Sequence, residues 1–318
     1  MVFYCDLCET NKFNFTYKYF YLMNPENFRG PYNPNAQKPK PKAPILNLDN
    51  EALSKVGKVI CIASGKGGVG KSTVAVNLAI TLARQGFRVG LADADVYGPS
   101  VPKMTGTEGV MPGIEVYDAS GRLMGPDEQI DETCKEVFIP VEKYNVKWMS
   151  IGYFAKPEQA LIWRGPMAST ALKQMVQQVR WGELDYLLID MPPGTGDIHI
   201  ALVNDIKLDG AVIVSTPQAV ALADVEKGVN MFRNPNINKP ILGVIENMAW
   251  FTPAEHPSEK YYIFGKDGCR PLCEKYGLKM LGQIPIVQSI REGGDSGKPA
   301  ACADGPIYTA LLGVVNNL

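Results

Sequence analysis

The sequence lacks any long apolar run and carries almost no net charge. No segment has the ~18 consecutive apolar residues that a membrane-spanning helix needs. The 32 basic residues balance 33 acidic residues and leave a net charge of -1. The aromatic stretch over residues 13–23 is interrupted by Asn, Thr and Lys, so it does not predict a secretion signal. We therefore expect no membrane partner, and no nucleic-acid partner either, because binding DNA or RNA needs a cationic surface.

Cysteine and histidine are both scarce. The seven cysteines are odd in number and scattered along the chain, which does not resemble a disulfide framework and favours a reducing compartment. We accordingly expect a cytoplasmic location. The two histidines, His199 and His256, offer little equipment for general acid-base catalysis.

Residues 1–44 differ in composition from the rest of the chain. Between positions 31 and 44, five prolines alternate with three lysines, a pattern that favours extended polyproline geometry over a packed core. We expect a Pro/Lys-rich, disordered tail over residues 1–44 and one folded domain over residues 45–318. Cys5 and Cys8 have a spacing that suits a metal ion, although four ligands are normally needed, and an unstructured leader is the alternative.

Short apolar runs alternate with helical patterns from Lys58 onward, which is typical of a parallel sheet covered by helices on both faces. The sequence thus predicts an α/β fold with a doubly wound, mostly parallel sheet of about seven strands, at residues 59–63, 89–92, 146–151, 186–189, 211–214, 241–245 and 280–284. Helices are expected at residues 72–85, 167–179, 219–232, 269–276 and 306–315. Residues 104–140 show no clean period and stay unassigned.

A glycine-rich segment joins the first predicted strand to the first predicted helix. It reads Gly65-Lys66-Gly67-Gly68-Val69-Gly70-Lys71-Ser72-Thr73, and it fits G-x-x-x-x-G-K-[ST] between a strand and a helix. In such a loop the backbone N–H groups wrap phosphate oxygens, and the helix dipole favours negative charge at its start. We expect Lys71 to reach the β- and γ-phosphates and Ser72 to ligate Mg²⁺.

Lys66 is a second lysine within this loop, and an ordinary loop of this kind does not require it. Its ammonium group must lie either in solvent or against phosphate. The segment resembles the deviant Walker A motif of the MinD, ParA and nitrogenase iron-protein group. The resemblance implies that Lys66 crosses the interface of an ATP-containing homodimer and contacts the partner's nucleotide.

Four acidic residues follow predicted strands or the loop after one, where the carboxyl edge of a parallel sheet meets its ligand. Asp93 and Asp95 end the second strand, and we expect Asp95 to act in catalysis and Asp93 to contact the nucleotide. Asp190 ends the run Tyr186-Leu187-Leu188-Ile189, as expected of a carboxylate that holds Mg²⁺. Asp197 follows in a Pro/Gly-rich loop suited to sensing the γ-phosphate. Helix caps and turn residues are the structural alternative for each.

The segments around these positions resemble one branch of this group, the Mrp/ApbC iron-sulfur cluster carrier ATPases. The resemblance runs in register from about residue 56 to residue 299 and includes Asp93-Ala94-Asp95-Val96-Tyr97-Gly98-Pro99-Ser100, Asp190-Met191-Pro192-Pro193-Gly194-Thr195-Gly196-Asp197 and Glu246-Asn247-Met248. It implies an ATP- and Mg²⁺-dependent homodimer that binds a 4Fe-4S cluster at the subunit junction and transfers it to iron-sulfur apoproteins, with assembly factors as further partners. It also implies that Asn247 and Pro285 contact the adenine, although either could simply end a strand.

The sequence departs from the family pattern where the cluster ligands are expected. The family places Cys-x-x-Cys shortly after this Asn-Met pair, whereas Pro253 and His256 stand near those positions here. Proline cannot ligate iron, and a lone histidine in a polar loop is usually solvated. Cys269 and Cys273 have helical i, i+4 spacing and are candidate iron-sulfur ligands; packing of a short helix is the alternative.

Three other functions are alternatives to the carrier. A nucleotide-switched scaffold in iron-sulfur assembly would need no cluster of its own, which fits the missing Cys-x-x-Cys. A MinD/ParA-like positioning ATPase would need a cationic surface or a basic C-terminal helix, whereas residues 307–318 contain no Lys or Arg. The third alternative is an enzyme that uses ATP to activate a carboxyl or amide group, and the fold alone does not distinguish such an enzyme from a carrier.

Overall fold

The computed structural model describes residues 50–318, apart from residues 97, 126, 132, 155–164 and 254. The predicted tail and the Cys5/Cys8 pair lie outside the described residues. No helix in the described part combines the length and the apolar character needed to span a membrane.

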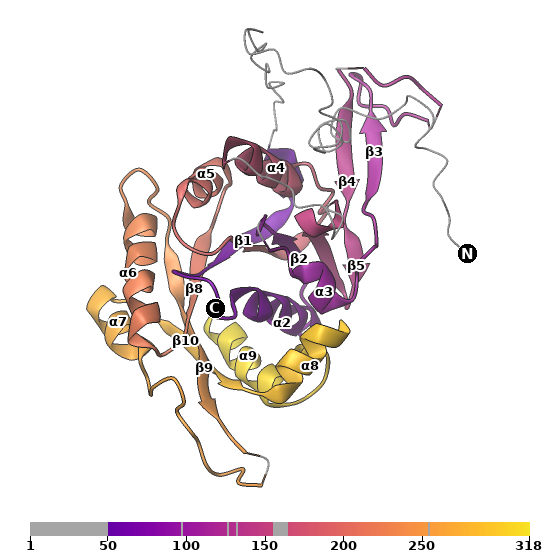
Figure 1. Ribbon diagram of the computed structural model, residues 1–318. Helices are drawn as coiled ribbons and strands as arrows, with labels where there is room; N and C mark the ends of the chain where they lie inside the picture. Colours follow the sequence, from indigo (N-terminus) through magenta and orange to yellow (C-terminus); the bar gives the residue numbers. More distant parts are fainter. Residues whose placement is uncertain (1–49, 97, 126, 132, 155–164, 254) are drawn as a thin grey trace, which may run out of the picture.

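A central eight-stranded sheet organises the chain (Figure 1), in the order β10-β9-β8-β1-β7-β2-β6-β5. All strand pairs are parallel except β5 with β6. The strands of this sheet are β1 (Val56–Ala63), β2 (Val89–Asp93), β5 (Val141–Lys143), β6 (Val146–Ser150), β7 (Leu184–Asp190), β8 (Gly210–Ser215), β9 (Ile241–Phe251) and β10 (Met280–Ile286).

The predicted fold class and all seven predicted strands are confirmed. The eighth strand, β5, has only three residues and pairs antiparallel with β6 across a tight turn at Tyr144 and Asn145, both with positive φ. Such a short edge strand gives no periodic signal. β1, β7 and β8 lie in the middle of the sheet, and their apolar runs are buried because helices cover both faces.

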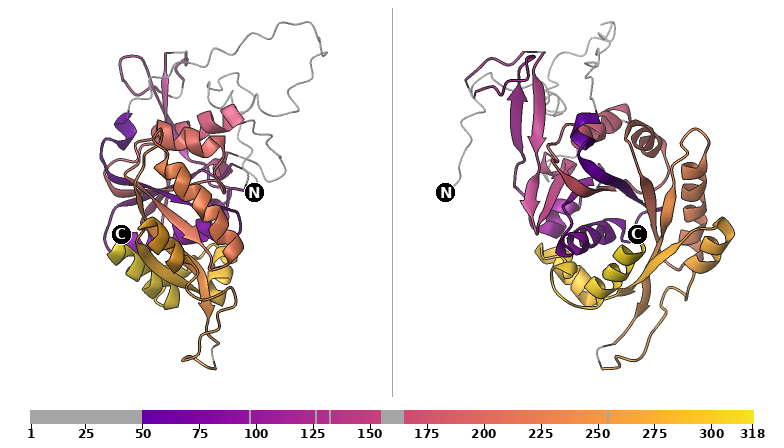
Figure 2. Two further views of the ribbon diagram at one scale, coloured as in Figure 1. Left: turned by 90° about the vertical axis from the view of Figure 1, so that its left-hand side faces the viewer. Right: turned by 180° about the vertical axis from the view of Figure 1, so that it is seen from behind.

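Helices lie on both faces of the sheet (Figures 1 and 2), with α2, α8 and α9 on one side and α4, α5, α6 and α7 on the other. The helices are α2 (Lys71–Arg84), α3 (Val101–Thr105), α4 (Gly165–Gln177), α5 (Asp197–Asp205), α6 (Ala219–Arg233), α7 (Cys269–Tyr276), α8 (Gln288–Ser296) and α9 (Pro306–Asn317), with short 3-10 turns at η3 (Asn50–Leu53), η4 (Ile151–Tyr153) and η5 (Ala300–Cys302). The five predicted helices are confirmed; α3, α5 and α8 were not predicted.

Residues 104–140, which show no clean period in the sequence, hold a second, separate sheet. β3 (Gly113–Tyr117) and β4 (Lys135–Ile139) form an antiparallel hairpin that stands beside the main sheet in Figure 1. Phe138 is buried, and its ring packs edge-on against Phe154 with the centroids 5.3 Å apart. Phe138 is the one buried apolar residue of these two strands, because the other buried position is Glu136, so the hairpin leaves little hydrophobic periodicity in the sequence.

The carboxyl ends of the central strands meet at one edge of the sheet. Asp93 at the end of β2 is the register partner of Asp190 at the end of β7, and Asp190 also pairs with Ile62 of β1. Parallel pairing therefore brings three strand ends, from distant parts of the sequence, to the start of the glycine loop.

Candidate nucleotide-binding site

The glycine loop connects the end of β1 to the first turn of α2. Gly68 and Gly70 adopt left-handed conformations, with φ of 81° and 80°, which residues with a Cβ adopt at a cost. The carbonyl of Gly70 accepts the backbone N–H of Val74 at 2.9 Å and begins the helix. A Cβ on Gly65 would lie 2.3 Å from the carbonyl carbon of Asp224 in α6, so the loop packs too closely for any side chain there.

Lys71 and Asp190 form a buried ion pair in this loop. The Lys71 Nζ atom lies 2.6 Å from Asp190 Oδ1 and 3.0 Å from Ser72 Oγ, and the two charged side chains are 6% and 0% exposed. Asp190 Oδ2 is buried and has no hydrogen-bond partner among the described residues. An orphaned carboxylate oxygen beside a hydroxyl is a suitable pair of ligands for Mg²⁺, so these residues fit the predicted ion.

Burial sets the proton affinity of Asp190. Desolvation raises the pKa of this carboxyl, and the charge of Lys71 acts in the opposite direction. The Lys71 ammonium is thus the counter-ion that allows Asp190 to remain ionised in a dry site. The three residues expected to hold phosphate and Mg²⁺, namely Lys71, Ser72 and Asp190, are brought together.

Asp93 is completely buried beside this pair and is bonded to the protein. Its carboxylate accepts hydrogen bonds from Ser150 Oγ at 2.9 Å and from the backbone N–H groups of Val101 at 3.3 Å and Asp95 at 3.2 Å. Through these hydrogen bonds Asp93 holds the start of α3 and the backbone of Asp95 in place. Direct contact of Asp93 with the nucleotide stays a prediction.

The other acidic residues and Lys66 lie at the same edge of the sheet. Asp95 is half-buried, and its Oδ1 accepts the N–H of Gly98 at 3.2 Å. Asp197 is the first residue of α5 rather than part of the preceding loop. Lys66 is half-buried, and within the described part of the chain no residue pairs with its ammonium group. The catalytic and sensing roles expected of these residues stay predictions.

The two residues expected to contact adenine lie next to each other in the sheet. Asn247 on β9 is the register partner of Ile284, which directly precedes the buried Pro285 on β10. The Asn247 Nδ2 group donates to the carbonyl of Val69 at 2.8 Å, so this side chain is tied to the glycine loop. Their position beside the loop suits a nucleobase, and the adenine contacts themselves stay a prediction.

Cys269 and Cys273 face the protein interior. They lie on α7 in a small apolar cluster that includes Val225, Val229 and Val244. Burial raises the pKa of the Cys269 thiol well above its usual range and that of Cys273 to about 11. Because iron is bound by thiolates, this placement disfavours cluster ligation and matches the packing alternative. Ligation by this pair therefore requires α7 to turn its inner face outward.

Among its described residues, the loop after β9 offers no replacement ligand set. His256 is exposed, and its Nδ1 lies 3.6 Å from Glu259 Oε1. Across the described parts of residues 50–318, no group of three or more His, Cys, Asp or Glu side chains is arranged to hold a metal ion.

Some residues of the site gave no sequence signal. Ser150 supports Asp93 from β6, and His199 of α5 contacts the carbonyl of Pro192 through its Nε2 atom at 2.7 Å. Neither belongs to a recognisable spacing, because each acts on a segment that reaches it only in the folded chain. A short distance to Asp190 in the sequence was the sole hint for His199.

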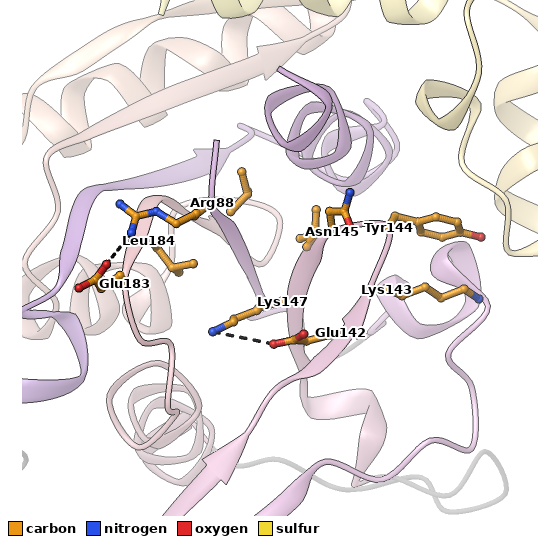
Figure 3. A pocket seen from close by; sticks show the side chains of 10 residues that line it. Arg88, Glu142, Lys143, Tyr144, Asn145, Lys147, Glu183 and Leu184 are labelled. Carbon is orange, nitrogen blue, oxygen red and sulfur yellow. Dashed lines mark hydrogen bonds and ion pairs between the residues drawn. The ribbon is translucent and has the colours of Figure 1, made fainter. Parts of the chain in front are cut away.

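A surface cavity of about 370 Å³ lies at the opposite edge of the sheet, near the starts of β2, β6 and β7 (Figure 3). Its charged side chains are already engaged. Arg88 contacts Glu183 at 2.6 Å, and Lys147 donates to the carbonyl of Trp181 at 2.8 Å. The cavity is separate from the glycine loop and contributes nothing to it.

The fold and the glycine loop with its buried Lys71–Asp190 pair define a P-loop nucleoside triphosphatase. Residues 55–318 match the family model described as ParA, NUBPL iron-transfer P-loop NTPase, and the chain belongs to this family. The family resemblance expected from the sequence is therefore confirmed.

Relatives and solved structures agree with this assignment. An iron-sulfur cluster carrier protein of Aquifex aeolicus is 46% identical over 83% of this chain and 67% of its own length. The Arabidopsis thaliana iron-sulfur protein required for NADH dehydrogenase, mitochondrial, is 48% identical over 78% of this chain and 72% of its own. A nucleotide-binding protein of Archaeoglobus fulgidus, solved in complex with ADP, has a TM-score of 0.66 at 35% identity and covers 82% of this chain and 93% of its own.

A more distant structure shows the fold alone. The cell division ATPase MinD of Pyrococcus furiosus is 20% identical, with a TM-score of 0.55 over 82% of this chain and 98% of its own.

The buried Asp93 predicts a specific pH dependence of stability. Burial, and then the nearby charge of Asp190, raise the pKa of Asp93 to about 7, whereas an aspartate in the unfolded chain titrates near ~3.9. Between about pH 4 and pH 7 the folded chain thus holds a proton that the unfolded chain has lost, so the free energy of unfolding falls as pH rises. We expect Asp93→Asn to flatten this decline, as measured by urea unfolding across that range.

Asp185→Asn is the matched control. Arg88 lowers the pKa of Asp185 to about 2, so its titration lies below the tested range. This variant should keep the wild-type slope. An unchanged slope in Asp93→Asn would contradict the assignment of the proton to Asp93.

Proposed function

We propose that this protein is an ATP-binding and ATP-hydrolysing iron-sulfur cluster carrier that works as a homodimer and loads 4Fe-4S clusters onto apoproteins. The observation that carries the proposal is the buried Lys71–Asp190 pair within a glycine loop, in a chain of the iron-transfer family. Relatives named as iron-sulfur cluster carriers or as an iron-sulfur cluster transfer protein support the same cargo. The expected cytoplasmic location stays a prediction.

Each part of the nucleotide site matches one part of Mg·ATP. The N–H groups of the loop and the start of α2 suit phosphate oxygens, and Lys71 supplies the positive charge. Ser72 Oγ and the orphaned Asp190 Oδ2 are available to hold Mg²⁺, which would neutralise charge that develops on the phosphates. Asn247 and Pro285 lie where the base would reach the sheet edge.

Binding requires Lys71 to change partners. In the structure its ammonium group neutralises Asp190 at 2.6 Å. When phosphate arrives, Lys71 exchanges the carboxylate for phosphate oxygens, and the positive charge near Asp190 must then come from the metal ion. Since removing one partner of a buried ion pair costs ~3–5 kcal/mol, nucleotide and Mg²⁺ are expected to bind together rather than separately.

The proposed homodimer rests on Lys66. Its side chain is half-buried at the mouth of the glycine loop, and its ammonium group has no partner among the described residues. A cation in this position can reach phosphate on a second subunit and act there as an arginine finger does in related hydrolases.

The proposed cargo site is the pair Cys269 and Cys273. They lie one turn apart on α7, whereas Cys61, Cys134 and Cys302 lie on separate segments of the described chain. The N–H of Cys269 donates to the buried Glu246 Oε2 at 2.7 Å, and Glu246 directly precedes Asn247. This contact connects the expected base site to the cysteine helix. In this proposal a change at Asn247 loosens α7 through this contact and exposes the thiols.

A second function is favoured by the burial of these same thiols. Both sulfurs pack in the core, and Pro253 and His256 stand where the resembling family has cysteines. A nucleotide-switched scaffold for cluster assembly would keep the ATP cycle and need no cluster of its own. A MinD/ParA-like positioning ATPase is a weaker alternative, since α9 carries no basic residue.

Lys66→Ala tests the dimeric mechanism. We expect its affinity for ATP to stay within about twofold of wild type while hydrolysis falls at least about tenfold, because Lys66 acts on the partner's phosphates. Calorimetry and phosphate release measure the two quantities. The control is Lys58→Ala, an exposed lysine on β1 near the opposite edge of the sheet, which should hydrolyse normally.

A mixture of two inactive variants tests directly whether Lys66 acts across the interface. Lys66→Ala and Lys71→Ala are each expected to be inactive alone, but a mixed dimer places an intact Lys66 opposite an intact Lys71. Partial recovery of hydrolysis in the mixture supports action across the interface. Hydrolysis by Lys66→Ala alone at the wild-type rate would refute it.

Anaerobic reconstitution with iron and sulfide tests the cargo. We expect bound iron and sulfide in equal amounts with broad visible absorption, both lost in the Cys269→Ser/Cys273→Ser double variant. Cys302→Ser is the control, because Cys302 is exposed and distant in sequence from α7. If the wild-type protein retains no iron, the carrier function fails and the scaffold function remains. If the double variant retains iron, the cluster is bound elsewhere.

A further inference from the structure

His199 is a buried titratable residue without an assigned role. It is the third residue of α5, and its side chain is 3% exposed. Its Nε2 atom lies 2.7 Å from the carbonyl oxygen of Pro192, two residues after Asp190. The contact thus joins α5 to the loop that begins at the proposed Mg²⁺ ligand.

The partner fixes the chemical state of the ring. A carbonyl oxygen only accepts hydrogen bonds, so Nε2 carries the proton and Nδ1 keeps its lone pair. Nδ1 is buried and has no partner among the described residues. Burial lowers the pKa of His199, and the nearby charge of Lys71 lowers it further. The ring is therefore a neutral donor directed at Pro192.

The loop after Asp190 has few other means of attachment. Pro192 and Pro193 have no N–H group, which leaves Met191 and Gly194 as the donors of residues 191–194. Both donate to β1 or the residue that follows it: Met191 to the carbonyl of Ile62 at 3.0 Å and Gly194 to that of Ser64 at 3.1 Å. The contact with His199 adds a further attachment to the same loop, at the carbonyl of Pro192.

The loop also lies close to the phosphate-binding segment. A Cβ on Gly67 would lie 3.8 Å from Pro193 Cβ, an ordinary van der Waals separation. A shift of Pro192 would therefore move Pro193 relative to the glycine loop and Asp190 relative to the metal site.

We propose that His199 is a positioning residue for ATP hydrolysis: its Nε2–H group clamps the carbonyl of Pro192 and thereby fixes the Asp190 loop against the glycine loop. The inference rests on the proposed ATPase function. A purely packing role would be served by an apolar side chain of similar volume, which would avoid the unpartnered Nδ1 atom. The Nε2–H donor explains why a polar imidazole occupies this buried position.

Three substitutions separate positioning from packing. His199→Leu fills the space without a donor, and we expect kcat to fall about tenfold with the KM for ATP within about twofold, the size of one lost hydrogen bond. His199→Gln carries an amide that can donate to Pro192, and it should recover most of kcat. Val203→Ala removes a fully buried side chain of the same helix and should lower Tm without lowering kcat.

Hydrogen exchange gives a readout that does not depend on turnover. In His199→Leu we expect the amides of Met191 and Gly194 to exchange about tenfold faster, with His199→Gln close to wild type and Val203→Ala unchanged at these two sites. If the wild-type protein hydrolyses no ATP, the proposed function fails, and exchange alone decides whether His199 holds the loop.

The proposal is overturned if His199→Leu keeps both wild-type kcat and wild-type exchange at the two amides. It is also overturned if His199→Gln is as impaired as His199→Leu, or if Val203→Ala reproduces the losses. Each of these results would show that the hydrogen-bond donor of His199 is not what positions the loop.

Discussion

The buried ion pair between Lys71 and Asp190 is the interaction on which the site depends. Two opposite charges lie 2.6 Å apart with almost no access to solvent. Such a pair is an expensive way to stabilise a fold, because desolvation of both ions offsets their attraction. Its presence is explained by separate roles of the two partners: Lys71 binds phosphate and Asp190 binds a divalent cation. The pair thus keeps both charges neutralised, and the same charges are available to a ligand.

The sheet topology makes this pair possible. β1 supplies the glycine loop, β7 supplies Asp190, and β2 places Asp93 beside it in register. All three strands end at one edge because they are parallel, and the side chains of Lys71, Asp93 and Asp190 are buried there. The supporting contacts are equally non-local: Ser150 reaches Asp93 from β6, and Asn247 reaches the glycine loop from β9. The site is therefore assembled from segments separated by up to about two hundred residues.

Much of this arrangement could be predicted from the sequence, for identifiable reasons. Gly65 to Thr73 is a contiguous motif, and Asp190 follows an apolar run, so the general rule about strand ends was enough to place them together. β5 and the β3–β4 hairpin escaped prediction because three-residue strands and half-exposed hairpins carry little pattern. His199 and Ser150 escaped because their partners, Pro192 and Asp93, are defined by tertiary contact and not by spacing.

The cysteines of α7 show a different limit. Their i, i+4 spacing correctly places both on one helical face, but spacing does not say which face is buried. Leu272 shares that face, whereas Arg270, Glu274 and Lys275 do not, and the apolar stripe packs inward against β8 and β9. The distribution of apolar and charged residues along the whole helix determines which face is buried, and therefore where the two thiols point.

We expect Lys71 and Asp190 to separate when each chain binds the phosphates and the metal ion of one nucleotide. Titration calorimetry of the full-length protein with ATP, with and without Mg²⁺, tests it most directly. We expect saturable heat at one ATP per chain that is much weaker without Mg²⁺ and absent in Lys71→Ala. Absence of binding heat with Mg²⁺, or equal binding by Lys71→Ala, would contradict it.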